Sequence, residues 1–347
     1  MSNQKQTALV ICPGRGTYNK DELGYLHRYH ADKLHILDAI DTERAVNGQK
    51  SVRELDSMAS YSMKQHTVGE NAASLIYACS KADFMAINRD KYDIVGVTGN
   101  SMGWYIALAV AGALNEANAA KLINTMGSMM AGGTIGGQSI YPIVDENWKV
   151  SPSMVEQVNS AMAEVNAHPD AELHESIRLG GYMVFGGNDK ALKMLESILP
   201  KLEERYPMRL FNHAAFHTPM LDDIAKKAQT LLPASLFQAP EVPLVDGKGQ
   251  IWQPYSTDVE KLHHYTLDAQ VNRTYDFTKA IEVSIKEFAP DKLIVLGPGA
   301  TLGGAIAQTL IMHKWQDFQD KADFISRQKV EPYLLAMGME KQREWVL

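Results

Sequence analysis

Three short apolar runs, each followed at once by a glycine-rich turn, constrain the fold of this chain most strongly. The runs are Ala8–Cys12, Ile94–Thr98 and Leu293–Leu296, and longer helical patterns alternate with them. Apolar runs of this length between glycines are typical of buried parallel strands in a sheet with helices on both faces. The sequence therefore predicts an α/β fold built on a parallel sheet.

The turns after these runs are expected to meet at one place. Pro13–Gly16 follows the first run, Gly99–Gly103 the second and Gly297–Gly299 the third. In open α/β sheets the binding site lies beyond the carboxyl ends of the strands. We therefore expect the three loops to converge on the functional site.

The middle of the chain has a different pattern. Three strand-like pieces and two helical stretches follow one another there, which is the inventory of a small α+β unit inserted into a larger one. They are Ser139–Val144, Pro152–Ala167, Tyr182–Phe185, Asp189–Glu204 and Met208–Phe211. We predict a large α/β unit formed by residues 1–134 and 213–314, a small inserted unit formed by residues 135–212, and a helical C-terminal extension formed by residues 315–347.

The charge balance and the cysteines exclude several classes of function. Of 347 residues, 41 are Asp or Glu and 34 are Lys or Arg, a net charge of −7. This balance argues against nucleic acid as the main partner, because phosphate binding needs a clustered positive surface. The two cysteines, Cys12 and Cys79, cannot form the disulfide framework of a small secreted protein, and they fit a reducing compartment.

Neither the N-terminal residues nor the longest uncharged run predicts a membrane protein. The N-terminal residues lack the long apolar region of a signal peptide before the first strand, so we expect a cytoplasmic location. The 22 residues between Asp93 and Glu116 carry no charge, which is long enough to span a bilayer. Glycines and polar residues interrupt this run, so it is interpreted as a buried strand, a tight turn and a buried helix.

The turn Gly99-Asn100-Ser101-Met102-Gly103 contains the candidate catalytic residue. It matches Gly-x-Ser-x-Gly between a strand and a helix, the context in which a serine stands on a strained turn with its hydroxyl exposed. The backbone N–H of Met102, at the start of that helix, is placed to stabilise an oxyanion. We interpret Ser101 as a nucleophile; the alternative is a merely polar loop between a strand and a helix.

A serine hydroxyl needs a base before it can attack, most often a histidine. Among eleven histidines, His213 and His217 are the serious candidates, because both follow a strand-like segment. His217 is the stronger, because it lies just before Thr218-Pro219, where a loop holds it at the strand-end rim. No cysteines or clustered carboxylates complete a ligand set around the other histidines, so no metal site is predicted.

Four motifs in order give the chain a resemblance to the malonyl-CoA:acyl carrier protein transacylase family. The family's forms are close to Phe-Pro-Gly-Gln-Gly, Gly-His-Ser-x-Gly-Glu, Ala-Phe-His-Thr-Pro and Val-Gly-Pro-Gly. This chain has Cys12-Pro13-Gly14-Arg15-Gly16, the Ser101 turn, Ala215-Phe216-His217-Thr218-Pro219 and Gly297-Pro298-Gly299. The resemblance covers about residues 8–310, and no correspondence is visible beyond about Lys314.

The resemblance implies a fold and a set of roles. The family has a hydrolase-like large subdomain with a small ferredoxin-like insert, which agrees with the layout predicted above. Ser101 would be the nucleophile, His217 the base and Gln270 the glutamine that the family keeps near that histidine. The backbone N–H groups of Met102 and Arg15 would form the oxyanion hole.

The implied reaction is ping-pong acyl transfer. Coenzyme A leaves as Ser101 attacks its thioester, and the phosphopantetheine thiol of an acyl carrier protein then takes the acyl group from the serine. The partners would be an acyl-CoA thioester and a carrier protein that brings its own phosphopantetheine, in fatty acid or polyketide biosynthesis. No bound cofactor is implied.

The chain departs from the family in the acyl pocket. Malonyl-specific members hold the substrate carboxylate with an arginine, and the alignment puts Met126 at its place. Asn100 replaces the usual histidine, Trp104 the usual glutamate and Arg15 the usual glutamine. Either the acyl group is neutral, or Arg15 supplies the missing cation from another wall. By resemblance, the bulk of Phe216 favours a small unbranched acyl group.

Three other functions compete with acyl transfer. A serine esterase or thioesterase shares the nucleophile and base, and Asp145 or Asp189 is its candidate acid. A nucleotide-binding module is indicated weakly by the glycines of residues 297–303, but Pro298 removes a donor N–H and the spacing is not Gly-x-Gly-x-x-Gly. A non-catalytic carrier-binding homologue is the third, against which the intact Ser101 and His217 count.

Overall fold

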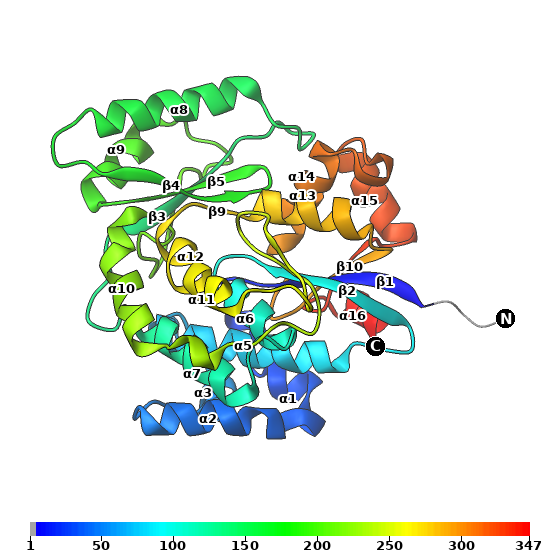
Figure 1. Cartoon of the computed structure of the whole chain (residues 1–347). Helices are drawn as coiled ribbons and strands as arrows, with labels where there is room; N and C mark the ends of the chain where they lie inside the picture. The colour runs from blue at the N-terminus through cyan, green and yellow to red at the C-terminus, as the bar shows by residue number, and fades with distance from the viewer. Residues whose placement is uncertain (1–4) are drawn as a thin grey trace.

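The computed structural model describes residues 5–347, and within them the strands form two sheets (Figure 1). The larger sheet has the order β11-β10-β1-β2-β7-β8, and all its neighbours are parallel except the last pair. The predicted parallel α/β fold is thus confirmed. Its strands are β1 (Gln6–Cys12), β2 (Tyr92–Gly99), β7 (Leu244–Val245), β8 (Ile251–Trp252), β10 (Lys292–Val295) and β11 (Leu334–Ala336). The first four residues of the predicted leaderless N-terminus lie outside the described part.

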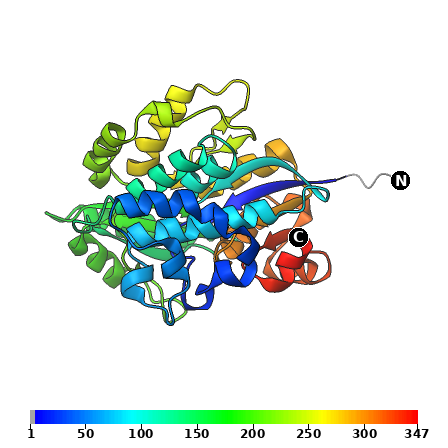
Figure 2. The ribbon, with the colours of Figure 1, turned by 90° about the horizontal axis from the view of Figure 1, so that it is seen from below.

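Helices cover both faces of this sheet. Helix α13 (Phe277–Phe288) packs on one face, and α6 (Gly103–Val110), which follows β2 directly, packs on the other (Figure 1). Seen from below, α2 (Leu37–Val46) and α5 (Gly69–Ala86) form an outer layer with α7 (Glu116–Ser128) (Figure 2). The remaining helices of this part are α1 (Tyr25–Tyr29), α3 (Val52–Asp56), α4 (Met63–His66), α10 (Asp222–Leu231), α11 (Val259–Leu267), α12 (Ala269–Asn272) and α14 (Leu302–Met312).

The smaller sheet has the order β6-β3-β5-β4-β9, and two helices cover its outer face (Figure 1). Four of its strands come from the segment predicted as an insert, and the fifth comes from the chain after it. The elements are β3 (Gly137–Pro142), α8 (Pro152–Asn166), β4 (Leu173–Leu179), β5 (Tyr182–Gly187), α9 (Asp189–Ile198), β6 (Met208–Leu210) and β9 (Tyr275–Asp276). Because β9 joins the smaller sheet, the division into units at residues 135 and 212 stays a proposal.

The tail from residue 315 differs from the helical extension predicted for it. Helices α15 (Lys321–Val330) and α16 (Glu340–Val346) are present, but β11 between them adds an edge strand to the larger sheet beside β10. Phe318, Leu335 and Met337 are buried in the main core. The prediction missed this because a three-residue strand is too short to show a periodicity. The tail is therefore part of the sheet and its core.

The uncharged run of residues 94–115 forms β2, a tight turn and α6, as predicted. None of the helices in residues 5–347 combines the length and the hydrophobicity that crossing a bilayer requires.

The three glycine-rich loops converge at the carboxyl ends of β1, β2 and β10, as predicted. A Cβ on Gly14 would lie 2.6 Å from the carbonyl oxygen of Asn100, and one on Gly299 would lie 2.7 Å from that of Thr17. Backbone approaches this close exclude any side chain at the two glycines. The loops therefore depend on glycine for their mutual packing.

Candidate active site

Ser101 stands on a turn whose conformation only a few residues tolerate. Its φ is +56°, in the left-handed region. A Cβ on Gly99 would lie 2.2 Å from the carbonyl oxygen of Gly103, and one on Gly103 would lie 2.3 Å from that of Cys12. The two glycines of the motif are thus required sterically, and the tight turn presents the serine at the floor of a cavity.

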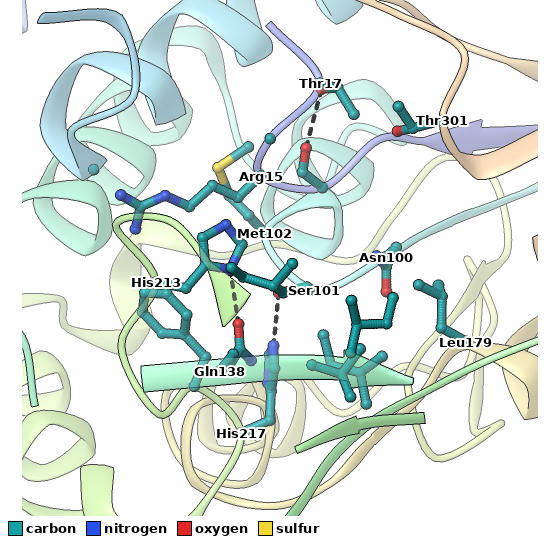
Figure 3. Close-up of a pocket in the computed structure, with 18 of the residues that line it drawn as sticks. Arg15, Thr17, Asn100, Ser101, Met102, Gln138, Leu179, His213, His217 and Thr301 are labelled. Carbon is teal, nitrogen blue, oxygen red and sulfur yellow. Dashed lines mark hydrogen bonds between the residues drawn. The ribbon is translucent and has the colours of Figure 1, made fainter. Parts of the chain in front are cut away.

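His217, which the sequence predicts as the base, is hydrogen-bonded to this serine. The distance from Ser101 Oγ to His217 Nε2 is 2.6 Å, and His217 Nδ1 lies 2.6 Å from the main-chain carbonyl oxygen of Gln270 (Figure 3 shows the Ser101–His217 bond). A carbonyl can only accept, so Nδ1 carries the hydrogen. The Nε2 lone pair therefore faces the serine hydroxyl, which is the arrangement that a general base needs.

His217 is neutral at physiological pH. Its side chain is almost fully buried, and this burial lowers its pKa to about 4, while the hydrogen bond to Gln270 acts in the opposite direction. A buried imidazole resists the charged form because water no longer solvates it. The imidazole is thus unprotonated and can accept a proton from the serine hydroxyl.

This pKa predicts the pH dependence of acylation. If Ser101 is acylated as the resemblance implies, the neutral imidazole is the form that accepts its proton, so the rate of acyl-serine formation should stay level from about pH 8 down to about pH 6 and fall only toward the pKa of about 4. Single-turnover acylation with acetyl-CoA, followed by intact mass, measures it. A fall centred near the ordinary histidine pKa of about 6.5 contradicts the burial argument.

Gln270 lies beside the histidine, where the resemblance placed it, and it is buried. Its main chain accepts from His217, its side-chain Nε2 donates to the carbonyl oxygen of Ser101 at 3.0 Å, and its Oε1 accepts from Tyr105 at 2.6 Å. The residue thus connects the serine turn to the histidine. Tyr105, one helical turn after Ser101, was missed in the sequence, although that spacing places it on the same helix face.

The two predicted oxyanion donors are free. Within residues 5–347, neither the N–H of Arg15 nor that of Met102 donates a hydrogen bond to another backbone group. Met102 precedes the first turn of α6, where unpaired N–H groups and the helix dipole favour negative charge. The donors therefore suit the oxygen of an attacked carbonyl.

The cavity above Ser101 has a volume of about 520 Å³ and holds the residues predicted for substrate binding. Asn100, Met126, Phe216 and Arg15 all line it. Met126 packs with Phe216 and Met130 in an apolar cluster, so no cation stands at that position. Trp104, by contrast, is fully buried and donates to Thr266, which leaves it outside the cavity lining.

Arg15 brings a cation into this cavity. Its guanidinium donates to the carbonyl oxygen of Thr67 at 2.8 Å and lies 5.6 Å from the centre of the Phe216 ring. Burial lowers the pKa of Arg15 to about 10, so the side chain stays charged at neutral pH. Among the residues that the structure describes, no carboxylate pairs with it within 4.0 Å. The charge is therefore available to a ligand.

His213, the weaker candidate base, lines the cavity, and within residues 5–347 it forms no hydrogen bond with the serine. Its Nδ1 lies 2.8 Å from Oε1 of Gln138, whose Nε2 lies 2.6 Å from Oγ of Ser176 (Figure 3 shows the first of these bonds). No local pattern in the sequence predicts this chain of hydrogen bonds, because its members come from separate strands and a loop.

The other predicted features lie elsewhere. Asp145 caps its own turn, and Asp189 pairs with Lys193 and Arg209 at the surface, so neither carboxylate reaches His217. The loop that begins at Gly297 contributes Thr301 to the cavity wall. In the described part of the chain no group of three or more His, Cys, Asp or Glu side chains could hold a metal ion. Both cysteines are buried and unpaired.

Solved structures share this architecture along almost the whole chain. The malonyl-CoA:acyl carrier protein transacylase of Xanthomonas oryzae superposes with a TM-score of 0.73 at 17% identity, covering 99% of this chain and 98% of its own. The Synechocystis enzyme of the same name gives 0.74 at 16%, covering 98% and 99%. The chain has the fold of the malonyl-CoA:acyl carrier protein transacylases. The likeness includes the tail, where the sequence resemblance ended.

The sequence similarity to curated proteins is weaker. PksC of Bacillus subtilis, a polyketide biosynthesis malonyl CoA-acyl carrier protein transacylase, is 24% identical over 211 residues, 60% of this chain and 67% of its own. A Mycobacterium marinum phenolphthiocerol synthesis polyketide synthase, Pks15/1, is 23% identical over 314 residues, 87% of this chain. The chain spans only 13% of that synthase's length. No family model matches the chain.

Proposed function

We propose that the chain is an acyltransferase that moves an acyl group from coenzyme A to the phosphopantetheine thiol of an acyl carrier protein. The observation that carries the proposal is the 2.6 Å contact of Ser101 Oγ with a histidine held in the base tautomer. The N–H groups of Arg15 and Met102, which donate to no other backbone group in residues 5–347, add to it. A structural relative, a type II polyketide malonyl-transacylase, was solved in complex with its acyl carrier protein. It supports a carrier protein as the partner.

In the first half-reaction Ser101 Oγ attacks the thioester carbonyl, and His217 Nε2 takes the hydroxyl proton. The negative charge that develops on the carbonyl oxygen is stabilised by the N–H groups of Arg15 and Met102. The carbon–sulfur bond then breaks, and His217 returns the proton to the coenzyme A thiolate. An acyl-serine and free coenzyme A result.

In the second half-reaction the carrier's thiol gives its proton to His217 as its sulfur attacks the acyl-serine. The ester bond breaks, and Ser101 recovers the proton. The proposed reaction uses the serine, the histidine, the two N–H donors and the two thiols, and it takes no bound cofactor or metal. We place it in the cytoplasm, where the sequence predicts the chain to act.

The acyl group that fits this cavity carries a carboxylate. Met126 cannot bind one, but the Arg15 guanidinium is charged, half-buried and without a carboxylate partner among residues 5–347. Guanidinium groups bind carboxylates with paired, charge-assisted hydrogen bonds. In malonyl-specific members an arginine at the position of Met126 binds the substrate carboxylate. We therefore propose that Arg15 binds the carboxylate in this chain.

Arg15→Ala tests this assignment. We expect the preference for malonyl-CoA over acetyl-CoA to fall by roughly 10- to 100-fold, because the charged hydrogen bonds are lost while the backbone N–H remains. The ratio is measured by competition, with both acyl-serine adducts resolved by mass. Arg205→Ala is the matched control, since Arg205 also lines the cavity but lies 3.4 Å from Glu203. A ratio that Arg15→Ala leaves unchanged contradicts the proposal.

Hydrolysis is the alternative outcome of the same acyl-serine. The Nδ1 hydrogen of His217 is bonded to a main-chain carbonyl instead of a carboxylate, and neither Asp145 nor Asp189 lies beside it. The geometry therefore does not favour a Ser-His-Asp hydrolase. Comparing acyl transfer to a phosphopantetheine thiol with release of the free acid separates the two. Faster release of the acid identifies a thioesterase, and the absence of any adduct identifies a non-catalytic homologue.

A further inference from the structure

A directed chain of hydrogen bonds ends at the half-buried His213 ring. Gln138 on β3 reaches Ser176 on β4 across the intervening strand β5, where Gly186 stands opposite Gln138 and carries no side chain. Ser176 Oγ in turn donates to the carbonyl oxygen of Phe216 at 2.7 Å. Gln138 and Ser176 are almost completely buried, so each must find its partners within the protein.

The far end of this chain fixes its direction. The Phe216 carbonyl can only accept, so the Ser176 hydroxyl donates to it and accepts from Gln138 Nε2. Gln138 therefore turns its Oε1 toward His213, and His213 Nδ1 must be the donor at 2.8 Å. The neutral ring then holds no hydrogen on Nε2, which is left as an acceptor. Reversing the chain would leave the Phe216 carbonyl oxygen without the Ser176 donor.

The free nitrogen of His213 shares the cavity with Arg15. Both residues line it (Figure 3). The ring centre of Phe216 lies 6.1 Å from that of His213 and 5.6 Å from the Arg15 guanidinium carbon. Within the described residues Nε2 has no hydrogen-bond partner. Burial, then the charge of Arg15 and the nearby His217, lower the pKa of His213 to about 3, so the ring stays neutral. A cationic donor and a neutral acceptor thus stand on one side of Ser101.

We propose that His213 selects an acyl group that carries a hydroxyl or amino group next to its free carboxylate. The carboxylate binds Arg15, and the O–H or N–H donates to His213 Nε2. A bare carboxylate gains nothing from His213, since the lone pair of Nε2 repels its oxygens. The inference rests on the proposed acyl transfer and assigns its substrate class. A hydroxyl adds a single heavy atom to an unbranched dicarboxylic acyl group, a small addition beside Phe216.

Competition between two synthetic thioesters tests the assignment. The wild-type chain is offered equal amounts of the N-acetylcysteamine thioesters of malonate and of hydroxymalonate, and the two acyl-serine adducts are counted by intact mass. We expect hydroxymalonyl to be favoured by roughly 10- to 100-fold, because a site built to accept a hydrogen bond discriminates against a ligand without the donor. The readout is a ratio within one sample, so a lower overall rate does not affect it.

Two variants then locate the preference. His213→Phe keeps a ring but removes the acceptor, and its ratio should fall to about one. Gln138→Leu removes the acceptor that holds Nδ1–H, so the ring can place its hydrogen on Nε2 and donate to a carboxylate; its ratio should shift toward malonyl. A wild-type ratio near one, or a preference that survives His213→Phe, overturns the inference. An absence of adduct with either thioester or with malonyl-CoA instead overturns the proposed acyl transfer.

Discussion

Ser101→Ala should abolish the acyl-enzyme and lower acyl transfer by at least about 10⁴-fold. In the proposed reaction the acyl group is bound covalently to Ser101 Oγ, which is the atom that His217 contacts at 2.6 Å. Removing the nucleophile of a serine–histidine pair leaves the remaining binding groups with only residual catalysis. Without the serine hydroxyl the acyl-serine ester cannot form, so neither half-reaction can take place.

The measurement is the intact mass of the chain after mixing with acyl-CoA. The wild-type chain should gain the mass of one acyl group, and that mass names the group. Ser197→Ala is the matched control, because Ser197 is exposed on α9 and its hydroxyl donates to the carbonyl oxygen of Met194 in the same helix. It should acquire the adduct like the wild type. An adduct that persists in Ser101→Ala places the nucleophile elsewhere and ends the assignment of this serine.

His217→Ala extends the same test to the base. With the imidazole gone, Ser101 keeps its strained turn and its oxyanion donors but has no proton acceptor within hydrogen-bonding distance in residues 5–347. Acylation should slow by about 10³- to 10⁶-fold, since the members of such a unit act together. A variant that acylates at the wild-type rate shows that the 2.6 Å contact is structural.

The serine and the histidine were predictable because local rules fix them. Glycines at 99 and 103 exclude side chains by direct contact, and a strand followed by a helix can be recognised over a short window. His217 precedes Thr218-Pro219 at a strand-end rim, again a local signal. The parallel sheet followed from apolar runs whose length and composition are properties of the runs themselves.

The parts that were missed depend on contacts between distant segments. Strand β11 has three residues and is defined by its pairing with β10, which no local pattern reveals. Likewise, Ser176 and Gln138 form a bond across a glycine of β5, and each looks like an ordinary polar strand residue in the sequence. The role of Arg15 was left open because its position in the cavity depends on how its loop packs against Thr67 and Phe216.

The tail is fixed to the loops of the site by one buried ion pair. Arg343 on α16 lies 2.7 Å from Asp83 on α5, and both side chains are buried. The same carboxylate accepts from Tyr25 at 2.8 Å and from the N–H of Gly297, the start of the third glycine-rich loop, at 2.7 Å. A charge in this position is tolerable only while its partners surround it.

Arg343→Met should therefore lower the free energy of unfolding by about 3–5 kcal/mol. The substitution keeps most of the apolar volume of the side chain but takes the guanidinium away from the buried Asp83 carboxylate, whose remaining ion-pair contact is His30 Nε2 at 2.7 Å. Urea unfolding followed by circular dichroism measures the change as a lower midpoint with a similar slope. Lys341→Ala, on the exposed side of the same helix, is the control and should change stability by less than about 0.5 kcal/mol.

The double variant Arg343→Met with Asp83→Asn separates charge burial from packing. An asparagine keeps an oxygen that can accept from Gly297 and Tyr25, and it carries no charge that needs Arg343. If the uncompensated charge causes the loss, the double variant should be more stable than Arg343→Met alone by about 1–3 kcal/mol, a coupling that independent sites do not show. Strictly additive losses mean instead that the guanidinium acts through its contacts with the Tyr25 and Tyr29 rings, which lie 5.7 and 4.4 Å away.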